Sequence, residues 1–284
     1  MPLHQVLVLA LVQGITEFLP ISSTAHLILV PWLFGWRDPG LTFDVALHVG
    51  TLAAVVVYFA RTWFRLLGLV LGRRLPPPGP GEPDQDLHQN PRLFWFLVAA
   101  TLPAALAGLL LERFAETSLR SPFIIAVMMI SVAALMWRAD RTGRFQKDLG
   151  GLSLADSLLI GLAQAAAIVP GASRSGTTIA AALFLGVRRS AAARFSFLLS
   201  TPIIAGAVLK AGWNILSAGG VAPEMRAAFA LGILVSGASG YAAISFLVRY
   251  LQLRTMQVFV AYRILCGIMI LALAIFFRDP VPAL

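Results

Sequence analysis

The sequence has few charged residues and a single cysteine, and both shortages exclude whole classes of protein. Only 12% of its 284 residues are charged, whereas 58% are hydrophobic, and the mean hydropathy is +0.83. A soluble globular chain carries about 25% charged residues, so this composition indicates a polytopic α-helical membrane protein. The lone Cys266 lies inside an apolar run, which excludes an intrachain disulfide and a cysteine metal cluster.

Basic residues outnumber acidic ones, yet their placement argues against a nucleic-acid partner. The net charge is +9, but the Lys and Arg residues lie between apolar stretches, where membrane topology already requires them. No Lys or Arg precedes the first apolar stretch, and no small-residue cleavage site follows it. We therefore expect this segment to remain in the protein and not to be removed as a signal peptide.

Six apolar stretches are long enough to cross a bilayer core of about 30 Å, which takes about 20 helical residues. The predicted spans are 43–59, 93–111, 122–137, 195–216, 227–248 and 256–277. Two further apolar regions are broken in the middle, with pieces at 3–18 and 25–36 and at 154–169 and 177–187. These pieces are too short, or too polar at one end, to cross, so each region is predicted to form a re-entrant helix hairpin.

The two broken regions occupy equivalent places in two halves of the chain. Gln13 and Gln164 are 151 residues apart, as are Ser22 and Ser173. Each half contains a hairpin and three spans, and an odd number of crossings inverts the second half relative to the first. The sequence therefore predicts one integral membrane domain over 1–284, built from inverted-topology repeats at about 1–137 and 152–278.

The distribution of Lys and Arg predicts the orientation of this domain. Fourteen of them fall on one side of the layout, at 61–92, 138–147, 188–194 and 249–254, and six fall on the other. Because cytoplasmic loops are enriched in Lys and Arg, the first side is predicted to be cytoplasmic and both termini to lie outside. The Pro- and Gly-rich stretch 73–92 is predicted to be a cytoplasmic surface loop without chemistry of its own.

Polar residues interrupt both hairpins at bilayer depth, where they are costly unless they line a cavity. The two segments are QGITEFLPISSTAH at 13–26 and PGASRSGTT at 170–178. The Ser and Thr residues that follow Pro20 and Pro170 are typical helix N-caps, so two helix N-termini would direct free N–H groups at one anion. Arg174 adds a planar donor for bidentate contact with phosphate oxygens. Phosphate or diphosphate is the predicted ligand.

Side chains of the first segment have the chemistry to act on that phosphate. Glu17 follows Gln13 by one helical turn, and His26 follows Ser22 by four residues, so each pair projects to one side of its helix. A carboxylate beside an anion site is repulsive unless it binds a metal ion or moves a proton, so Glu17 is a candidate for either role, with Gln13 beside it as a second candidate metal ligand. With Ser23 or His26 as the nucleophile, the segment has the composition of a phosphatase site.

Charged groups outside the two segments keep alternative interpretations. Arg263, in the last span, is favoured as a structural charge that pairs with a carboxylate or with carbonyls, and a second phosphate contact is the alternative. Asp44 and His48, four residues apart at the start of a span, fit either the rim of the site or the solvation of a helix end. Asp156 is predicted to be a residue of the N-terminal turn of its helix.

Four segments of the chain resemble the bacterial undecaprenyl-diphosphate phosphatases of the bacitracin-resistance family, namely QGITEFLPISSTAHL, PGASRSGTT, TFDVALHVGTLAAVVVYF and RFSFLLSTP. The resemblance extends over essentially the whole chain. It implies an inner-membrane hydrolase that converts the lipid undecaprenyl diphosphate to undecaprenyl phosphate and inorganic phosphate. Such an enzyme recycles the lipid carrier for peptidoglycan synthesis and confers bacitracin resistance. A divalent cation, Mg²⁺ or Ca²⁺, and a homodimer are also implied.

The same resemblance implies roles for individual residues. The catalytic positions are Glu17, Ser23, His26 and Arg174, and the phosphate-binding positions are Ser22, Thr24, Ser173, Ser175, Gly176 and Thr178. Gln13 stands where many members carry glutamate, which weakens any metal site that needs two carboxylates.

The preferred mechanism has Ser23 attack the terminal phosphorus, with His26 as general base or acid. Attack by His26 itself stays open. The alternative function is a polyprenyl-phosphate lipid-carrier transporter (flippase), because inverted repeats with broken helices also move substrates across membranes.

Overall fold

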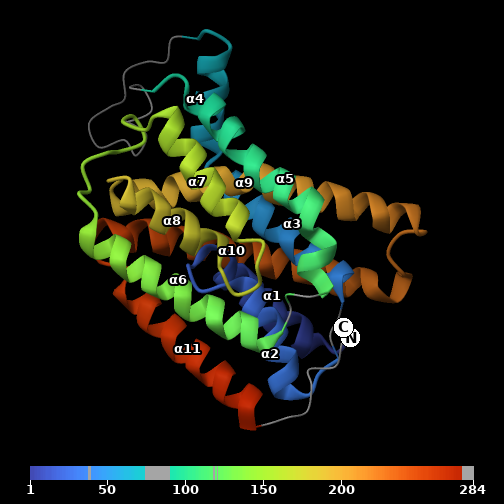
Figure 1. The fold of residues 1–284 in the computed structure, drawn as a ribbon. Coiled ribbons are helices and arrows are strands. Elements are labelled where there is room, and N and C mark those ends of the chain that lie inside the picture. Colours follow the sequence, from blue (N-terminus) through green and yellow to red (C-terminus); the bar gives the residue numbers. More distant parts are fainter. Residues whose placement is uncertain (38–39, 74–89, 118, 120, 277–284) are drawn as a thin grey trace.

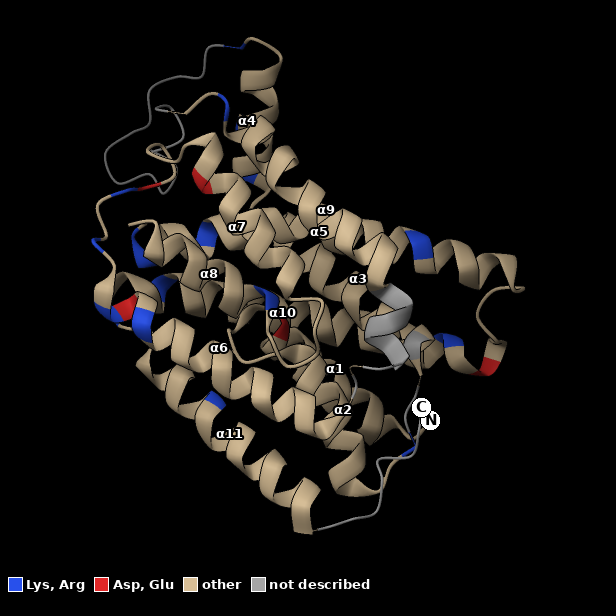
Figure 2. Ribbon diagram, in the orientation of Figure 1, with Lys and Arg blue, Asp and Glu red and all other residues tan. Residues whose placement is uncertain are grey.

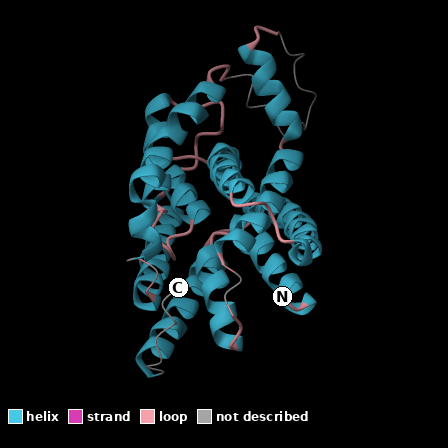
Figure 3. Ribbon diagram, turned by 90° about the vertical axis from the view of Figure 1, so that its right-hand side faces the viewer, coloured by secondary structure: helices cyan, strands magenta, loops and turns pink. Residues whose placement is uncertain are grey.

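The computed structural model describes residues 1–276 apart from 38–39, 74–89, 118 and 120, and this part of the chain is helical (Figure 1). In chain order the helices are α1 Leu3–Phe18, α2 Ser23–Phe34, α3 Leu41–Tyr58, α4 Ala60–Val70, α5 Leu93–Thr117, α6 Pro122–Thr142, α7 Leu154–Ala166, α8 Arg174–Phe184, α9 Arg189–Ser217, η2 Pro223–Met225, α10 Arg226–Leu253 and α11 Gln257–Phe276. Figure 3 shows helices joined by loops throughout the described residues. The predicted all-α class is confirmed. Most of the predicted loop 73–92 lies outside the described residues.

The membrane spans agree with the prediction in number, with one difference in shape. Five stretches are long and apolar enough to cross a membrane, in α5, α6, α9, α10 with η2, and α11. Helices α3 and α4 meet that test only together, and they are bent by 67° at their junction. The predicted span 43–59 coincides closely with α3, and the chain continues beyond it as a second, differently directed helix. With the bent pair counted once there are up to six candidate spans, and the chain is a multi-pass membrane protein.

Four shorter helices form the two predicted hairpins. α1 and α2 have 16 and 12 residues, and α7 and α8 have 13 and 11. At about 1.5 Å per residue, none reaches the roughly 30 Å of a bilayer core. The members of each pair pack on one another. Figure 1 shows both breaks near the centre of the molecule, with α5 and α9 on one side and α6 and α11 on the other.

Small residues let α10 approach the first half of the chain closely. A Cβ atom on Gly14 of α1 would lie 2.5 Å from the carbonyl oxygen of Ser236, and one on Gly50 of α3 would lie 2.1 Å from the Ser236 hydroxyl. Only glycine permits such contacts between helix backbones. The buried ring of Phe18, at the end of α1, meets Phe197 of α9 edge to face at 5.4 Å. The first hairpin is thus held between α10 and α9.

Lys and Arg lie mainly at the ends of helices (Figure 2). At one such end, Asp140 of α6 accepts hydrogen bonds from Arg189 of α9 and from the backbone N–H of Met256, just before α11. One carboxylate therefore joins α6 to the starts of α9 and α11, and both α6 and α9 pack on α8.

Helix α7 begins with a capping box, as expected for Asp156. Ser153 and Asp156 each accept the other's backbone N–H, at 3.1 and 3.0 Å, and Lys147 donates to Asp156 at 3.0 Å. Burial alone would raise the pKa of Asp156, but the hydrogen bonds from Ser153 and Lys147 outweigh it and hold that pKa below its usual value. The start of the second hairpin is thus fixed by local polar contacts.

Candidate active site

In both hairpins the second helix begins after a serine N-cap with a positive φ. Ser22 caps α2 and Ser173 caps α8, with φ of 76° and 68° and ψ of 97° and 109°. Their side chains accept the N–H groups of Ala25 and Gly176, at 3.5 and 3.2 Å. The predicted N-caps are confirmed. A positive φ is strained for serine, and the first-turn N–H groups that follow each cap have no partner within their helix.

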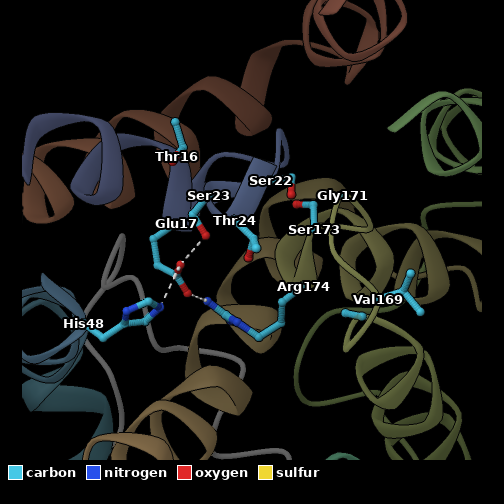
Figure 4. Close-up of a pocket in the computed structure, with 11 residues that line it drawn as sticks. Thr16, Glu17, Ser22, Ser23, Thr24, His48, Val169, Gly171, Ser173 and Arg174 are labelled. Carbon is cyan, nitrogen blue, oxygen red and sulfur yellow. Dashed lines mark hydrogen bonds and ion pairs between the residues drawn. The ribbon is translucent and has the colours of Figure 1, made fainter. Parts of the chain in front are cut away.

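A polar cavity of about 120 Å³ lies between the two caps (Figure 4). It is lined by Thr16, Glu17, Ser22, Ser23 and Thr24 of the first hairpin, by His48 of α3, and by Ala167, Val169, Gly171, Ser173 and Arg174 of the second hairpin. Two segments about 150 residues apart in the chain thus form one site. Its volume suits a phosphate-sized group, and its lining supplies donors of the kind that bind phosphate.

Glu17 is the centre of the polar contacts in this cavity. Its Oε1 accepts a hydrogen bond from Arg174 Nη2 at 2.9 Å. Its Oε2 accepts from Ser23 Oγ at 2.6 Å and from Gln13 Nε2 at 3.1 Å. The Glu17 and Arg174 side chains are only 8% and 13% exposed, so each charge depends on the other for compensation. A short hydrogen bond from a serine hydroxyl to a carboxylate is the arrangement that activates a nucleophile.

Arg174 keeps donor capacity beyond its pair with Glu17. Its Nη1 is buried and has no hydrogen-bond partner among the described residues. Figure 4 shows the side chain reaching across the cavity toward the first hairpin. A guanidinium with one nitrogen paired and one unpaired can bind an anion without first losing its carboxylate partner.

His48 lies on the rim of the cavity, which decides between the two interpretations that the sequence left open. Its Nδ1 donates to the carbonyl oxygen of Asp44 at 2.7 Å, and its Nε2 lies 3.8 Å from Glu17 Oε2. The sequence signal was the spacing of four between Asp44 and His48. That spacing could not show that the ring faces Glu17, because the contact depends on how α1 and α3 pack.

His26 lies outside the cavity lining, although the sequence predicts it as catalytic. Its Nδ1 is 2.7 Å from the Ser22 carbonyl oxygen, to which it donates, and its Nε2 is 2.5 Å from the Tyr262 hydroxyl. In the neutral ring, Nε2 is then the acceptor for that hydroxyl. His26 therefore contacts the site through the backbone of Ser22. Its catalytic role stays a prediction.

Three of the predicted phosphate-binding residues, Ser22, Thr24 and Ser173, line the cavity, and the other three, Ser175, Gly176 and Thr178, do not. The Ser175 hydroxyl donates to the Leu19 carbonyl oxygen at 3.2 Å and so joins the two hairpins. The Thr178 hydroxyl lies 2.7 Å from that of Ser196, between α8 and α9. These contacts hold the hairpins in place behind the cavity.

One mostly apolar cavity adjoins the polar one, and a second apolar cavity adjoins the first. A cavity of about 220 Å³ shares Ser23, Thr24 and His48 with it and is otherwise lined by Leu27, Ile28, Asp44, Val45, Ala207 and Val208. A larger one, of about 600 Å³, lies between α5 and α9 and shares Ala207 with the second. A polar chamber adjoining apolar ones suits a ligand with a charged head and an apolar tail.

The predicted metal ligands, Glu17 and Gln13, provide one anionic and one neutral oxygen donor. Glu17 is the single carboxylate among the residues that line the polar cavity. The described residues contain no group of three His, Cys, Asp or Glu that could bind a metal by themselves. Gln13 is fully buried, and its Oε1 has no hydrogen-bond partner among the described residues. Because Mg²⁺ is commonly held by one or two carboxylates together with substrate phosphates, these donors fit a cation that arrives with a phosphate ligand.

Arg263 of α11 lies behind the site, fully buried and outside the lining of the polar cavity. Among the described residues, its guanidinium donates to backbone carbonyls alone. The favoured interpretation, a structural charge paired with carbonyls, is confirmed.

Comparison with known proteins gives matches over nearly the full length of the chain. An undecaprenyl-diphosphatase of Moorella thermoacetica is 47% identical over 272 residues, which cover 96% of this chain and 98% of the relative. An undecaprenyl-diphosphatase of Thermomicrobium roseum is 42% identical over 292 residues, covering 98% of this chain and 100% of the relative. Undecaprenyl-diphosphatase 2 of Stutzerimonas stutzeri is 46% identical over 285 residues, covering 96% and 98%. The family profile described as "Bacitracin resistance protein BacA" matches residues 6–269. Because that match includes both hairpins and the whole polar cavity, the chain belongs to the BacA bacitracin resistance protein family.

Proposed function

We propose that this protein hydrolyses undecaprenyl diphosphate to undecaprenyl phosphate and inorganic phosphate in the bacterial inner membrane. The observation that carries the proposal is the contact of Ser23 Oγ with Glu17 Oε2, at 2.6 Å, in the cavity that also holds Arg174. The choice of undecaprenyl diphosphate as the substrate is supported by the relatives, which are named undecaprenyl-diphosphatases. The reaction renews the lipid carrier for peptidoglycan synthesis and thereby confers resistance to bacitracin.

The diphosphate head binds in the polar cavity, and the polyprenyl chain extends into the apolar ones. Arg174 Nη1, which has no partner among the described residues, is the donor for the phosphate oxygens. The N–H groups at the starts of α2 and α8 supply further donors, favoured by the positive ends of both helix dipoles. Ser23, Thr24 and His48 line both the polar and the adjoining apolar cavity, so the junction of phosphate and lipid lies beside the nucleophile.

The reaction begins with proton transfer from Ser23 to Glu17. The Ser23 oxygen forms a bond to the terminal phosphorus while the bond from that phosphorus to the bridging oxygen breaks. Undecaprenyl phosphate leaves with the bonding electron pair, and a phosphoserine remains. A water then attacks the phosphoserine, the serine oxygen regains a proton, and inorganic phosphate is released.

Arg174 and Glu17 compensate each other before the substrate arrives. A phosphate bound to Arg174 Nη1 shares the charge of the guanidinium with Glu17, and a carboxylate whose cation is partly neutralised by another anion accepts a proton more readily. Substrate binding and activation of Ser23 are therefore coupled. His26 supports the nucleophile by fixing the carbonyl of Ser22, and its contact with Tyr262 at 2.5 Å favours Ser23 over His26 as the attacking group.

A divalent cation, Mg²⁺ or Ca²⁺, is part of the proposal, with Glu17 as its anionic ligand and Gln13 as a neutral one. When bound, the cation offsets negative charge on the phosphate oxygens. The proposal also includes homodimers. It further includes two inverted repeats with re-entrant hairpins, and the matching conformations of Ser22 and Ser173 support these repeats. It places both termini outside, so single cysteines in the segment 73–92 should react with an impermeant reagent only from the cytoplasmic side.

Phosphate release by the purified protein in detergent tests the function. We expect release from undecaprenyl diphosphate, and we expect Ser23→Ala to abolish it while the variant still elutes as folded protein. A chelator should lower the activity, and added Mg²⁺ or Ca²⁺ should restore it. A lipid-carrier transporter would release no phosphate, and that result would overturn the proposal.

A further inference from the structure

Arg263 makes an unusual set of contacts for a buried charge. It is 0% exposed, and among the described residues no carboxylate lies within ion-pair distance of it. Its guanidinium donates to five backbone carbonyl oxygens, those of Pro20 at 3.3 Å, Met128 at 3.3 Å, Met129 at 3.2 Å, Gly171 at 2.9 Å and Ala172 at 3.1 Å. These carbonyls come from the break of the first hairpin, from α6 and from the break of the second hairpin. One side chain thus joins the two breaks that form the site.

We propose that Arg263 is a positioning residue for the hydrolysis, which holds the two breaks so that Ser23 faces the phosphate bound by Arg174. The inference rests on the proposed function. A purely structural charge would affect folding alone. The proposal assigns to Arg263 a separate effect on the rate of the chemical step.

The hydrogen bonds that Arg174 and Ser175 make between the hairpins constrain this placement less firmly during the reaction. Arg174 donates to Glu17 at 2.9 Å, but both groups act on the substrate, and a bound phosphate shares the charge of the guanidinium. Ser175 donates to the Leu19 carbonyl oxygen at 3.2 Å, which is a single hydrogen bond between neutral groups. Arg263 lies outside the polar cavity lining. Its hydrogen bonds therefore remain in place whether the cavity is empty or filled.

Arg263 also determines the direction of one backbone donor. In a trans peptide the carbonyl and the following N–H point in opposite directions. Because the Ala172 carbonyl points at Arg263, the N–H of Ser173 points away from it, and Ser173 lines the cavity. Ser173 has a strained φ of 68°, which persists only if surrounding contacts enforce it. The hydrogen bonds from Arg263 to the two preceding carbonyls supply that constraint.

Lysine is not equivalent at this position. A guanidinium spreads five N–H donors over a rigid plane, whereas an ammonium has three donors on one nitrogen. Three segments cannot all be reached from that single nitrogen. Arg263→Lys therefore keeps the charge and loses part of the connection between the breaks, and Arg263→Met loses both.

Steady-state kinetics and thermal unfolding of the detergent-purified protein test the proposal. The control is Arg226→Lys, because Arg226 is exposed, donates to the carbonyl oxygen of Val221 and does not line the polar cavity. We expect Arg263→Lys to lower kcat by about 10- to 100-fold with little change in KM, as a misplacement of about 1 Å does. Arg263→Met should lower kcat further and also lower Tm, and Arg226→Lys should change neither. Because residues that act as a unit are not additive, Arg263→Lys should cost little more in an Arg174→Ala background.

Each other outcome of this experiment has a definite meaning. A wild-type kcat for folded Arg263→Lys overturns the positioning role, and so does a full, additive loss in the Arg174→Ala background. If neither variant folds, Arg263 is purely structural and the proposal is wrong. An inactive wild-type protein would instead contradict the proposed function itself.

Discussion

The two hairpins share a backbone conformation but differ in the side chain that follows the cap. Ser22 and Ser173 have nearly the same φ and ψ, and each caps its helix through its own hydroxyl. The next residue is Ser23 in the first hairpin and Arg174 in the second. The shared backbone supplies an anion site from two helix N-termini. The differing side chains supply a nucleophile on one side and a cation on the other, so binding and chemistry are divided between the hairpins.

The hairpins also differ in how they begin. α7 starts with a capping box and an ion pair to Lys147, whereas α1 starts after Pro2 without a side-chain cap. The first hairpin is instead held by packing, through Gly14 against α10 and Phe18 against α9. We therefore expect substitutions at the start of α7 to affect stability and those at the two breaks to affect catalysis.

The largest effect is expected for the pair of reactive groups in the first hairpin. Ser23→Ala removes the nucleophile and Glu17→Gln removes its proton acceptor, and each should lower kcat by about 10⁴- to 10⁶-fold. Because the two residues act as a unit, the double variant should lose little more than either single one. Rapid acid quenching of the wild-type protein with labelled substrate should trap an acid-stable phosphoester on Ser23. An acid-labile label would instead identify His26 as the nucleophile.

The next largest effect concerns the cation of the second hairpin. Arg174→Ala should lower kcat/KM by about 10³-fold or more, the loss seen when a cation that stabilises transferring phosphoryl groups is removed. Arg174→Lys should lose less, because it keeps the charge but not the two-pronged donor geometry. Arg188→Lys, at the exposed start of α9, is the matched control and should be unchanged. Equal activities of the alanine variant and the wild-type protein would exclude Arg174 from phosphate binding.

The breaks and caps of the hairpins could be predicted from the sequence because their causes are local. Pro20 and Pro170 lie in the two breaks, where proline disfavours continuation of the helix, and a serine that follows each of them caps the next helix. The bend between α3 and α4 could not, because hydropathy measures whether a segment is apolar and not its direction. The side chains that contact the two histidines could not be predicted from the sequence either. His26 meets Tyr262, 236 residues away, and His48 meets Glu17 through the packing of α1 on α3.

A smaller effect should separate the two histidines. His26→Ala loses the donor to the Ser22 carbonyl and should lower kcat by about 10- to 100-fold, as loss of a supporting contact commonly does. Tyr262→Phe removes only the outer contact of that ring and should cost less than about 10-fold. A greater loss for Tyr262→Phe than for His26→Ala would show that the contact with Tyr262, and not the one with Ser22, is the important one.

The smallest effect is expected at the start of α7, where stability should change and catalysis should not. Asp156→Asn removes the ion pair with Lys147 and weakens the cap, at a cost of about 1 kcal/mol, so Tm at neutral pH should fall by a few degrees with kcat unchanged.

The pKa of Asp156 is lower in the folded protein than its usual value of about 3.8. Its contribution is therefore complete above that value and is lost as the pH falls below it. The Tm difference between the wild-type protein and Asp156→Asn should accordingly narrow below pH 3.8. Asp148→Asn is the control, because the asparagine oxygen can still accept the exposed hydrogen bond from the Gly151 N–H, and it should show a smaller difference at neutral pH. A Tm difference for Asp156→Asn that stays constant from neutral to acidic pH would mean that the charge of Asp156 does not stabilise the second hairpin.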